Sequence, residues 1–497
     1  MRTLAIVLFF TVYGAANLGL MIYGLNCYIM LYLSRLGWIH AEKALKARGP
    51  LAANPENDPA LPVITTQIAV YNEVNVAERA LRAACAMRYP AGKHEIQVLD
   101  DSTDETVGLI DRIAAELKAH GHDIQIVRRR HRTGFKAGAL EAGLNQARGE
   151  LIAVFDADFV PPPTFLFQVV PFFLTNARLG FAQARWGHLN RRQSLLTLAQ
   201  AIGIDGHFLV EQPARSGSGL FLNFNGTAGI WRREAIVAGG GWSWDTLTED
   251  LDLSYRVQFK GWEALYLPDV VVEAELPEDV NAFRSQQFRW AKGSIQTIIK
   301  LFPQLVRANV SPFKKIQAFL HMTGYMVHPL MLILSLLSLP VLSLTRDFKT
   351  GGLLYAILAI PLILSILAPT TMYSVGQFKA SPNWRRRLLL MPLMMVVGVG
   401  LALSNSRAIV EAMIGRESEF VRTPKRGGRE IKVYRVRMPW LGVLEVLLGA
   451  YCCHTLSIYL LASKFVVSPF LAIYAAGFLF IGSLTIAQSL IPARQRL

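Results

Sequence analysis

Cysteine is scarce in this sequence, with four residues in 497: Cys27, Cys85, Cys452 and Cys453. Because there is no CxxC pair and three of the four lie in long apolar runs, neither a zinc site nor a disulfide framework is supported. Two phosphate-binding motifs are also missing. There is no GxxxxGK followed by Ser or Thr, and no GxGxxG follows the first predicted strand. These absences argue against a P-loop phosphotransferase and a dinucleotide-dependent oxidoreductase.

Charge is absent from long stretches of the chain. The first, Leu4–Leu33, is long enough for a helix to cross a bilayer, which takes about 20 apolar residues. A cleaved signal peptide is the alternative, but its apolar region has only about 7–15 residues. Four hydrophobic runs follow in the C-terminal third: Ile316–Leu344, Gly351–Gly376, Met438–Ser463 and Phe465–Ile491. We therefore expect a multi-pass membrane protein with one crossing before a central domain and four after it.

The formal net charge of +15 comes largely from basic segments beside the hydrophobic runs. They read FKASPNWRRR, VRTPKRGGREIKVYRVR and PARQRL, and by the positive-inside rule they face the cytoplasm. A basic chain can also bind nucleic acid, but here the charge follows the membrane edges, so we expect no nucleic-acid partner. Leu388–Ser406 is basic on both flanks, which predicts an interfacial or re-entrant helix. Ser34–Pro312 is then cytoplasmic.

The central segment alternates strand and helix patterns from Leu61 onward. The strand-like stretches VITTQIAVY, EIQVLD, DIQIVRR and LIAVFDAD are separated by helical ones, which predicts a Rossmann-like α/β fold with a parallel sheet. Ligands of such sheets bind at the carboxyl ends of the strands. The first strand ends in YNE, the second in DDSTD and the fourth in DADF. A lone Asp there would be a turn residue, whereas three acidic clusters at one edge indicate a site.

Three elements of this edge are candidates for binding a metal ion and a phosphate group or for proton transfer. Asp156 and Asp158 suit Mg²⁺, which binds one or two carboxylates together with substrate phosphates. Lys136 at a helix start either binds an anion or is an exposed surface lysine. Thr248 or Asp250 caps the amphipathic helix that follows, or else the Asp250 carboxylate deprotonates a hydroxyl.

Eight motifs occur in order along the chain: QIAVYNE, EIQVLDDSTDET, KAGAL, FDADF, QARWGHLN, NFNGTAGIW, TEDLDL and QQFRW. Together they resemble the family 2 inverting glycosyltransferases of the cellulose synthase superfamily. The likeness is strongest to the cellulose synthase-like A and C group, which makes β-1,4-mannan, glucomannan and glucan backbones. It covers nearly the whole central domain, implies a GT-A-type α/β fold for it, and matches the arrangement of hydrophobic runs.

The resemblance implies a role for each matching residue. The donor nucleotide and diphosphate would be bound by Tyr71, Glu73, Asp101, Lys136, Asp156 and Arg289. A divalent cation, Mg²⁺ or Mn²⁺, would be held by Asp156 and Asp158. The acceptor would be bound by Asn225, Gly226, Thr227, Glu249, Gln286 and Trp290. Asp250 would be the catalytic base.

The segment EFVRTPK resembles the FxVTxK gating loop of cellulose-synthase-type enzymes. Phe420, Thr423 and Lys425 match that pattern, whereas Arg422 stands where Val is usual. The alternative is a basic juxtamembrane loop that only follows the positive-inside rule. We expect a gating loop, because that rule requires neither Phe nor Thr.

The stretch AFRSQQFRWAKGS mixes amides, charges and an indole just before the first C-terminal hydrophobic run. Gln286, Arg289 and Trp290 occupy positions i, i+3 and i+4, so they share one face of a helix. That face is predicted to meet the sugar and the diphosphate. Arg284 and Lys292 are predicted to face the lipid surface.

The predicted organisation has seven parts. They are an N-terminal transmembrane helix at 1–34, a linker at 35–60, a cytoplasmic glycosyltransferase domain at 61–280, interfacial helices with QxxRW at 281–315, a transmembrane hairpin at 316–376, an interfacial helix and gating-like loop at 377–437, and a transmembrane hairpin with a basic tail at 438–497.

The leading hypothesis is a membrane-embedded processive β-glycan synthase. It would transfer glucose or mannose from UDP-glucose or GDP-mannose to a growing polysaccharide and move the polymer across the lipid bilayer. The alternative is a single-transfer glycolipid glycosyltransferase acting on ceramide or a polyprenyl carrier, because such enzymes share the DxD and QxxRW motifs. An inactive receptor-like or scaffold protein is a further interpretation. The presence of all the expected active-site residues argues against it: Asp156, Asp158, Asp250, Arg289 and Trp290.

Overall fold

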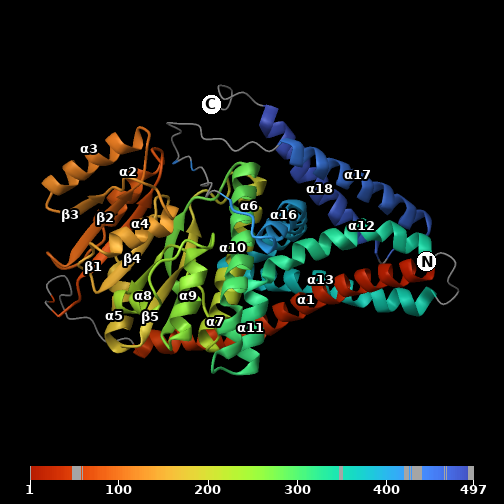
Figure 1. The fold of residues 1–497 in the computed structure, drawn as a ribbon, viewed down its shortest axis with the longest axis horizontal. Coiled ribbons are helices and arrows are strands. Elements are labelled where there is room, and N and C mark those ends of the chain that lie inside the picture. The colour runs from red at the N-terminus through yellow and green to blue at the C-terminus, as the bar shows by residue number, and fades with distance from the viewer. Residues whose placement is uncertain are drawn as a thin grey trace.

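In this computed structural model, residues 2–47, 58, 60–345, 351–418, 425, 427, 439–463, 465 and 467–490 are described. Figure 1 shows an α/β domain at one end of the molecule and long helices at the other. Helices α10 (Val280–Arg307) and α16 (Ala402–Met413) lie between the two parts.

The α/β domain contains a seven-stranded sheet in the order β3-β2-β1-β4-β6-β5-β7. Its strands are β1 (Ile64–Val70), β2 (His94–Asp100), β3 (Asp123–Val127), β4 (Leu151–Asp156), β5 (Leu179–His188), β6 (Gly229–Arg232) and β7 (Glu263–Ala274). The helices packed on it are α2 (Ala77–Cys85), α3 (Thr106–Ala119), α4 (Phe135–Leu144), α5 (Phe165–Thr175), α8 (Arg233–Ala238) and α9 (Glu249–Phe259). The predicted alternation of strands and helices is confirmed.

The sheet is buried on both faces, because successive side chains of a strand point to opposite sides. In β4, Leu151, Ala153 and Phe155 join the hydrophobic core formed with α2, α3 and α5. Ile152 and Val154 of the same strand join the second core, formed with α4, α8 and α9. The domain is therefore a sheet between two helical layers, which leaves the strand ends as the place for a site.

The register brings the acidic strand ends together. Strands β2 and β4 flank β1 and run parallel to it, with Val70 opposite Asp100 and Ala69 opposite Asp156. The residues that follow these three strands therefore lie at one edge of the sheet, as predicted.

Strand β6 departs from the predicted parallel sheet, because it runs antiparallel to both β4 and β5. The loop that leads into β6 contains two residues with positive φ, Gly226 at 79° and Ala228 at 59°. Since β6 enters the sheet where the parallel strands end, this loop lies at the same edge as the acidic clusters. A short apolar strand carries no signal of its direction, so the sequence pattern did not predict this reversal.

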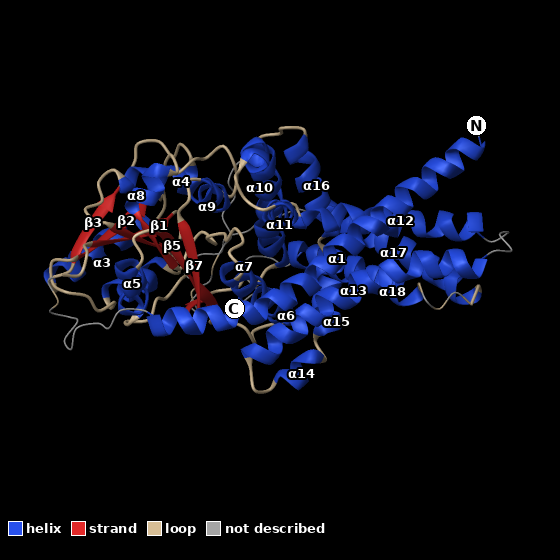
Figure 2. Ribbon diagram, turned by 90° about the horizontal axis from the view of Figure 1, so that it is seen from below, coloured by secondary structure: helices blue, strands red, loops and turns tan. Residues whose placement is uncertain are grey.

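The other helices form the long helical part of the molecule and its junction with the α/β domain (Figure 2). They are α1 (Arg2–Ala47), α6 (Leu195–Gly206), the π-helical turn η2 (His207–Glu211), α7 (Gln212–Gly217), α11 (Pro312–Met322), the short η3 (Gly324–Met326), α12 (Val327–Thr345), α13 (Gly351–Ala380), α14 (Trp384–Leu388), α15 (Met391–Gly400), α17 (Pro439–Leu461) and α18 (Ser468–Leu490).

Four helical stretches of the described residues are long and apolar enough to cross a membrane: Ile6–Ala47, Gly324–Leu344, Trp440–Leu461 and Ser468–Leu490. They correspond to four of the five predicted crossings, and the chain is a membrane protein. The fifth, Gly351–Gly376, lies within helix α13, and its crossing stays a prediction. The stretch Trp384–Gly400 continues into Ala402–Met413 with a bend of 41°, the form of a broken span or a re-entrant loop.

Helix α1 corrects the predicted linker at 35–60, because it remains helical as far as Ala47. Trp38 Nε1 donates a hydrogen bond to the carbonyl of Leu209 at 3.2 Å. A Cβ at Gly37 would lie 1.9 Å from the carbonyl oxygen of Pro213, so the two backbones touch there. This docking and the helix-forming Ala, Glu, Lys and Leu residues keep the segment helical. The rest of the linker lies mostly outside the described residues.

Arg284 and Lys292 do not face lipid, which corrects the prediction for them. Arg284 is 1% exposed, and its Nη2 lies 2.7 Å from Glu445 Oε2 on α17 and 2.7 Å from Thr485 Oγ1 on α18. Lys292 is fully buried, with its Nζ 3.2 Å from Glu411 Oε2 on α16. Because α16, α17 and α18 cover this side of α10, both cations pair with acidic residues that lie far away in the sequence.

Replacing Arg284 by Met should lower the free energy of unfolding by about 3–5 kcal/mol, because Glu445 is then a buried charge without its cation. The double variant Arg284→Met/Glu445→Leu should recover most of that loss. Denaturant unfolding of the protein in detergent micelles measures both changes. Arg307→Met, at an exposed position in the last turn of the same helix, is the matched control. A double variant no more stable than the single one would contradict this account.

Candidate active site

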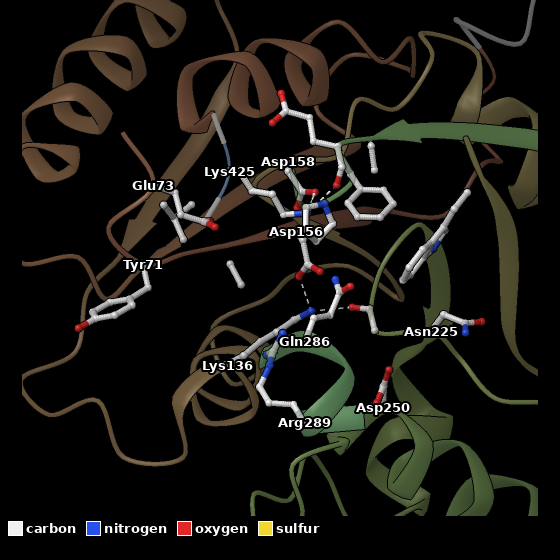
Figure 3. Close-up of a pocket in the computed structure, with 18 of the residues that line it drawn as sticks. Tyr71, Glu73, Lys136, Asp156, Asp158, Asn225, Asp250, Gln286, Arg289 and Lys425 are labelled. Carbon is white, nitrogen blue, oxygen red and sulfur yellow. Dashed lines mark hydrogen bonds and ion pairs between the residues drawn. The ribbon is translucent and has the colours of Figure 1, made fainter. Parts of the chain in front are cut away.

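A cleft opens at the carboxyl ends of β1, β2 and β4. It also receives the loop before β6, the start of α9 and one face of α10. Of the residues predicted for the site, those lining it are Tyr71, Glu73, Asp101, Lys136, Asp156, Asp158, Asn225, Gly226, Glu249, Asp250, Gln286, Arg289, Trp290 and Lys425. Figure 3 shows Tyr71 and Glu73 at one end and Asn225 and Asp250 at the other, with Lys136 and Asp156 between them.

Three predicted residues do not contribute described side chains to this cleft. Thr227 is fully buried, and its Oγ1 accepts a hydrogen bond from the backbone N–H of Asp156 at 2.9 Å. Its side chain therefore supports the strand end and does not line the cleft, which corrects its assignment to the acceptor. Phe420 and Thr423 lie outside the described residues, so their predicted place in a gating loop stays a prediction.

The end of the cleft at Tyr71 is built from an aromatic ring and two arginines. The guanidinium of Arg132 lies over the Tyr71 ring, 3.4 Å from its centroid. Arg129 forms a two-point contact with Asp101, with Nε 3.0 Å from Oδ1 and Nη2 2.5 Å from Oδ2. Arg132 was not predicted, although the run RRRHR holds it. A flat cation over a ring and a fixed carboxylate are groups that bind a nucleobase and a ribose.

Two lysines meet the two carboxylates of the DxD motif. Lys136 Nζ pairs with Asp156 Oδ1 and donates to the carbonyl of Gly226 at 2.8 Å. Burial alone would lower the pKa of Lys136, but the attraction of Asp156 and other nearby carboxylates outweighs it, and the pKa is raised. Lys425 Nζ lies 2.7 Å from Asp158 Oδ2. The sequence therefore places two cationic groups where a diphosphate would need them.

The donor set at this point fits a hard divalent cation that is shared with a phosphate group. Within the described residues, no cluster of three or more His, Cys, Asp or Glu side chains could hold a metal ion by itself. Asp156 and Asp158 both line the cleft and offer carboxylate oxygens there. Mg²⁺ is commonly held by one or two carboxylates, with substrate phosphates completing its ligands. The two aspartates therefore fit a cation that arrives with the nucleotide.

Asp250 lies in the first turn of α9, beside the loop that contains Gly226 and leads into β6. Its Oδ1 accepts a hydrogen bond from the N–H of Leu251 at 2.8 Å. A Cβ at Gly226 would lie 3.0 Å from Asp250 Oδ2, so glycine keeps this oxygen accessible. Burial and the neighbouring Glu249 carboxylate raise the pKa of Asp250 to about 7. Such a carboxylate is matched to accept a proton near neutral pH.

The structure excludes side-chain capping of α9 by Thr248 but not by Asp250, whose Oδ1 accepts a hydrogen bond from the first-turn N–H of Leu251. Thr248 occupies the N-cap position of α9 but makes no side-chain cap hydrogen bond. Its Oγ1 instead lies 3.1 Å from Thr297 Oγ1 on α10. A Cβ at Gly293 would lie 2.6 Å from the Thr248 side chain. Close packing of α9 on α10 thus fixes Asp250 relative to the QxxRW face.

Gln286, Arg289 and Trp290 all reach the cleft from α10, which confirms that they share one helix face. Burial lowers the pKa of Arg289, while the carboxylates of Glu249 and Asp156 oppose that shift. The Trp290 ring lies 6.5 Å from the ring of Trp186 on β5, with 51° between the ring planes. Trp186 was not predicted as a site residue, although the motif QARWGHLN contains it. The two indoles form an apolar wall suited to a sugar ring.

Comparison with known proteins gives the chain its family. The sequence model described as "Glycosyltransferase like family 2" matches residues 62–293. Glucomannan 4-beta-mannosyltransferase 7 of Arabidopsis thaliana is 32% identical over 456 residues, which is 86% of this chain and 78% of that protein. Probable glucomannan 4-beta-mannosyltransferase 11 of the same plant is 33% identical over 439 residues, 85% of this chain and 96% of that protein.

One further match covers only about half of this chain, and another has low sequence identity. Glucomannan 4-beta-mannosyltransferase 1 of Oryza sativa subsp. japonica is 41% identical over 272 residues, 53% of this chain and about half (52%) of that protein. A mannosyltransferase from Pyrobaculum calidifontis, solved in complex with GDP-Man and Mn²⁺, covers 80% of this chain and 100% of its own at 19% identity. Its TM-score against this chain is 0.48.

The long alignments cover 86% and 85% of the chain, so they extend beyond the sheet into its helical part. They confirm the predicted GT-A-type domain and the predicted inverting hexosyltransferase activity. The chain belongs to the family 2 glycosyltransferases, in the cellulose synthase-like group of the glucomannan 4-β-mannosyltransferases.

Proposed function

We propose that this protein is a processive synthase of a β-1,4-linked mannan or glucomannan, with GDP-mannose as its main donor and UDP-glucose as a second one. One observation carries the proposal: a single cleft joins Asp250, the DxD carboxylates and the QxxRW face of α10. The relatives named as glucomannan 4-beta-mannosyltransferases support mannose as the sugar. Because glucomannan also contains glucose, UDP-glucose is proposed as the second donor.

The donor is proposed to lie along the cleft from Tyr71 to Arg289. Tyr71, Glu73 and Asp101 take the nucleoside, and Lys136 and Arg289 face the diphosphate. A divalent cation held by Asp156 and Asp158 would supply charge stabilisation for the departing diphosphate. Arg289 and Lys136 add fixed positive charge at the same place, where burial strengthens their effect.

The acceptor sugar is proposed to lie between Trp290 and Asp250. An indole face packs on the C–H surface of a sugar ring and excludes water from it. Gln286 and Asn225 provide polar groups for hydroxyls at the two sides of that ring, and Glu249 lies beside the base. In this position the reacting hydroxyl of the acceptor points at the Asp250 carboxylate.

The proposed transfer is one displacement. Asp250 takes the proton of the acceptor hydroxyl, and the hydroxyl oxygen forms a bond to C1 of the donor sugar. The bond from C1 to the diphosphate oxygen breaks, and its electron pair leaves with the nucleoside diphosphate. A single in-line displacement inverts C1, so one base and one charge-stabilising centre are enough.

We further propose that the domain at 61–280 faces the cytoplasm and that the polymer leaves through the membrane helices. The basic segments beside the hydrophobic runs support this orientation. Helix α10 supports the route, because it carries the acceptor face and packs on the helices that lead into the membrane. Lys425, beside Asp158, is proposed to belong to a gating loop over the donor.

The donor assignment is tested by giving purified protein a panel of radiolabelled nucleotide sugars with Mg²⁺ or Mn²⁺. Labelled polymer from GDP-mannose that a β-1,4-mannanase degrades is the expected result. Mixed incubation with UDP-glucose should add label that remains in mannanase fragments. Polymer from UDP-glucose alone, or label found only in a lipid with one sugar, would contradict the proposal. Asp250→Asn protein serves as the inactive control.

The pH dependence follows from the base. Because the pKa of Asp250 is raised to about 7, most of the carboxyl is protonated below that pH and unable to accept a proton. We expect kcat/KM to rise with pH through about 7 and then level off. A pH–rate profile with initial rates measures this, and size-exclusion at each pH excludes aggregation. A profile that is flat across this range would argue against Asp250 as the base.

Removal of divalent cations should abolish transfer reversibly. Activity should return when Mn²⁺ or Mg²⁺ is added after the chelator is removed. Asp158→Asn should raise the cation concentration for half-maximal activity by at least about tenfold, because one of two carboxylate ligands is lost. Asp111→Asn, at an exposed position on α3, should leave that concentration unchanged. Full activity in the presence of the chelator would contradict the proposed cation.

A further inference from the structure

A hydrogen-bonded network lies behind the acceptor end of the cleft, in a helix to which the mechanism assigns no role. Residues Leu195–Gly217 form α6 and α7 with the π-helical turn His207–Glu211 between them. A π turn is rare and is found frequently at functional sites, where it changes which side chains share a face. The turn therefore calls for a physical reason.

The π turn brings two side chains onto one histidine. Its backbone hydrogen bonds span five residues, so both the fourth and the fifth residue after His207 lie beside it. Glu211 Oε2 is 2.9 Å from His207 Nδ1, and Gln212 Nε2 is 3.2 Å from His207 Nε2. A regular α-helix would bring only Glu211 to this face.

The same histidine contacts a residue that lines the cleft. Asn225 Nδ2 lies 3.0 Å from His207 Nε2, and Asn225 Oδ1 accepts from Gln212 Nε2 at 2.5 Å. The backbone N–H of Asn225 donates to Gln183 Oε1 at 2.8 Å. The oxygen and the nitrogen of the Asn225 side-chain amide therefore both have hydrogen-bond partners, and so does its backbone N–H.

These contacts fix the tautomer of the histidine. With the Asn225 amide in this orientation its nitrogen is the donor, so His207 Nε2 accepts from it and the ring proton is assigned to Nδ1. That proton is donated to Glu211, whose other oxygen accepts from Arg215 Nε at 3.0 Å. Burial would raise the pKa of Glu211, but Arg215 and the neighbouring histidines outweigh it and hold that pKa well below its usual range. Glu211 is thus an ionised acceptor for the Nδ1 hydrogen.

We propose that His207, oriented by Glu211, is a positioning residue that sets the Asn225 amide to donate its second Nδ2 hydrogen to a hydroxyl of the acceptor sugar. The inference rests on the proposed function, because it assumes that this end of the cleft takes the acceptor. Without the histidine, Gln212 alone binds the amide, through its oxygen, and the direction of the N–H is no longer set by an acceptor. The π turn then has its reason, since it places Glu211 and Gln212 around one imidazole.

The test compares His207→Phe with His207→Gln in the full-length protein, using manno-oligosaccharides as acceptors and GDP-mannose as donor. Phe removes the acceptor nitrogen, whereas the Gln amide can donate to Glu211 and accept from Asn225. We expect His207→Phe to raise the KM for the oligosaccharide about 3- to 10-fold, the loss of one hydrogen bond. The KM for GDP-mannose, measured by its slow hydrolysis in the absence of acceptor, should stay within about twofold. His207→Gln should restore most of the acceptor affinity.

Two further variants guard against a purely structural effect. Gln212→Leu frees the other end of the Asn225 amide and should give the same selective rise in acceptor KM. His120→Phe makes the same chemical change at an exposed position after α3 and should change neither KM. A rise in both KM values, or an unchanged acceptor KM in His207→Phe, would overturn the inference alone. If the wild-type protein transferred sugar from no donor, the proposed function would fail first.

Discussion

Asp250→Asn is expected to lower the rate of sugar transfer by about 10²- to 10⁴-fold, the usual contribution of a positioned general base. The amide has nearly the shape of the carboxylate and can still accept from the N–H of Leu251, so the first turn of α9 should stay intact. What is lost is the group that takes the acceptor proton. Initial rates with GDP-mannose and a manno-oligosaccharide measure the loss.

The rate loss at Asp250 should appear in kcat and leave the donor affinity nearly unchanged. Asp269→Asn makes the same substitution at an exposed position of β7 and should keep the wild-type rate. Thermal unfolding of both variants in detergent shows whether either one loses its fold. A folded Asp250→Asn protein with more than about a tenth of the wild-type rate would rule out this residue as the base.

Arg289→Met should reduce kcat by about 10²- to 10³-fold, as expected when a buried donor to developing negative charge is removed. The guanidinium is buried, and the carboxylates of Glu249, Asp156 and Asp250 favour its charged form, so a cation is present where the diphosphate would depart. The nucleoside contacts near Tyr71 remain, so the KM for the donor should change less than kcat does. Stopped assays over a range of donor concentrations separate the two constants.

The Arg289→Lys variant separates the effect of positive charge on the rate from the effect of guanidinium geometry. Arg289→Lys keeps the charge but loses the planar fork that binds two oxygens at once, so it should recover only part of the lost rate. Arg307→Met removes an exposed arginine from the last turn of α10 and should have no effect on either constant. Equal activity of the Met variant and the wild type would remove Arg289 from the proposed mechanism.

The acidic residues at the edge of the sheet could be predicted from local sequence patterns and from the rule that parallel strands bind ligands at their carboxyl ends. VITTQIAVY, EIQVLD and LIAVFDAD have the composition of buried strands, and each is followed by acidic residues. Parallel strands bring those ends together, so Asp101, Asp156 and Asp158 were expected in one cleft. The face of Gln286, Arg289 and Trp290 followed in the same way from helical spacing.

What could not be predicted depends on pairs that are distant in the sequence. Arg284 has the appearance of a lipid-facing cation until Glu445, 161 positions away, is placed against it. Thr227 resembles an acceptor residue within its motif, but its side chain turns inward to Asp156 because β6 runs antiparallel. His207 gave no sequence signal, since a π turn has no composition of its own.

The central claim is that the cleft elongates one glycan and passes it through the membrane helices. It is tested most directly by sizing the product that the purified protein makes in proteoliposomes from radiolabelled GDP-mannose. The account predicts long mannanase-sensitive chains from the first turnovers, which become protected from external mannanase as they enter the vesicle lumen. A product that stays at one sugar on a lipid, or polymer that remains wholly digestible from outside, would contradict it.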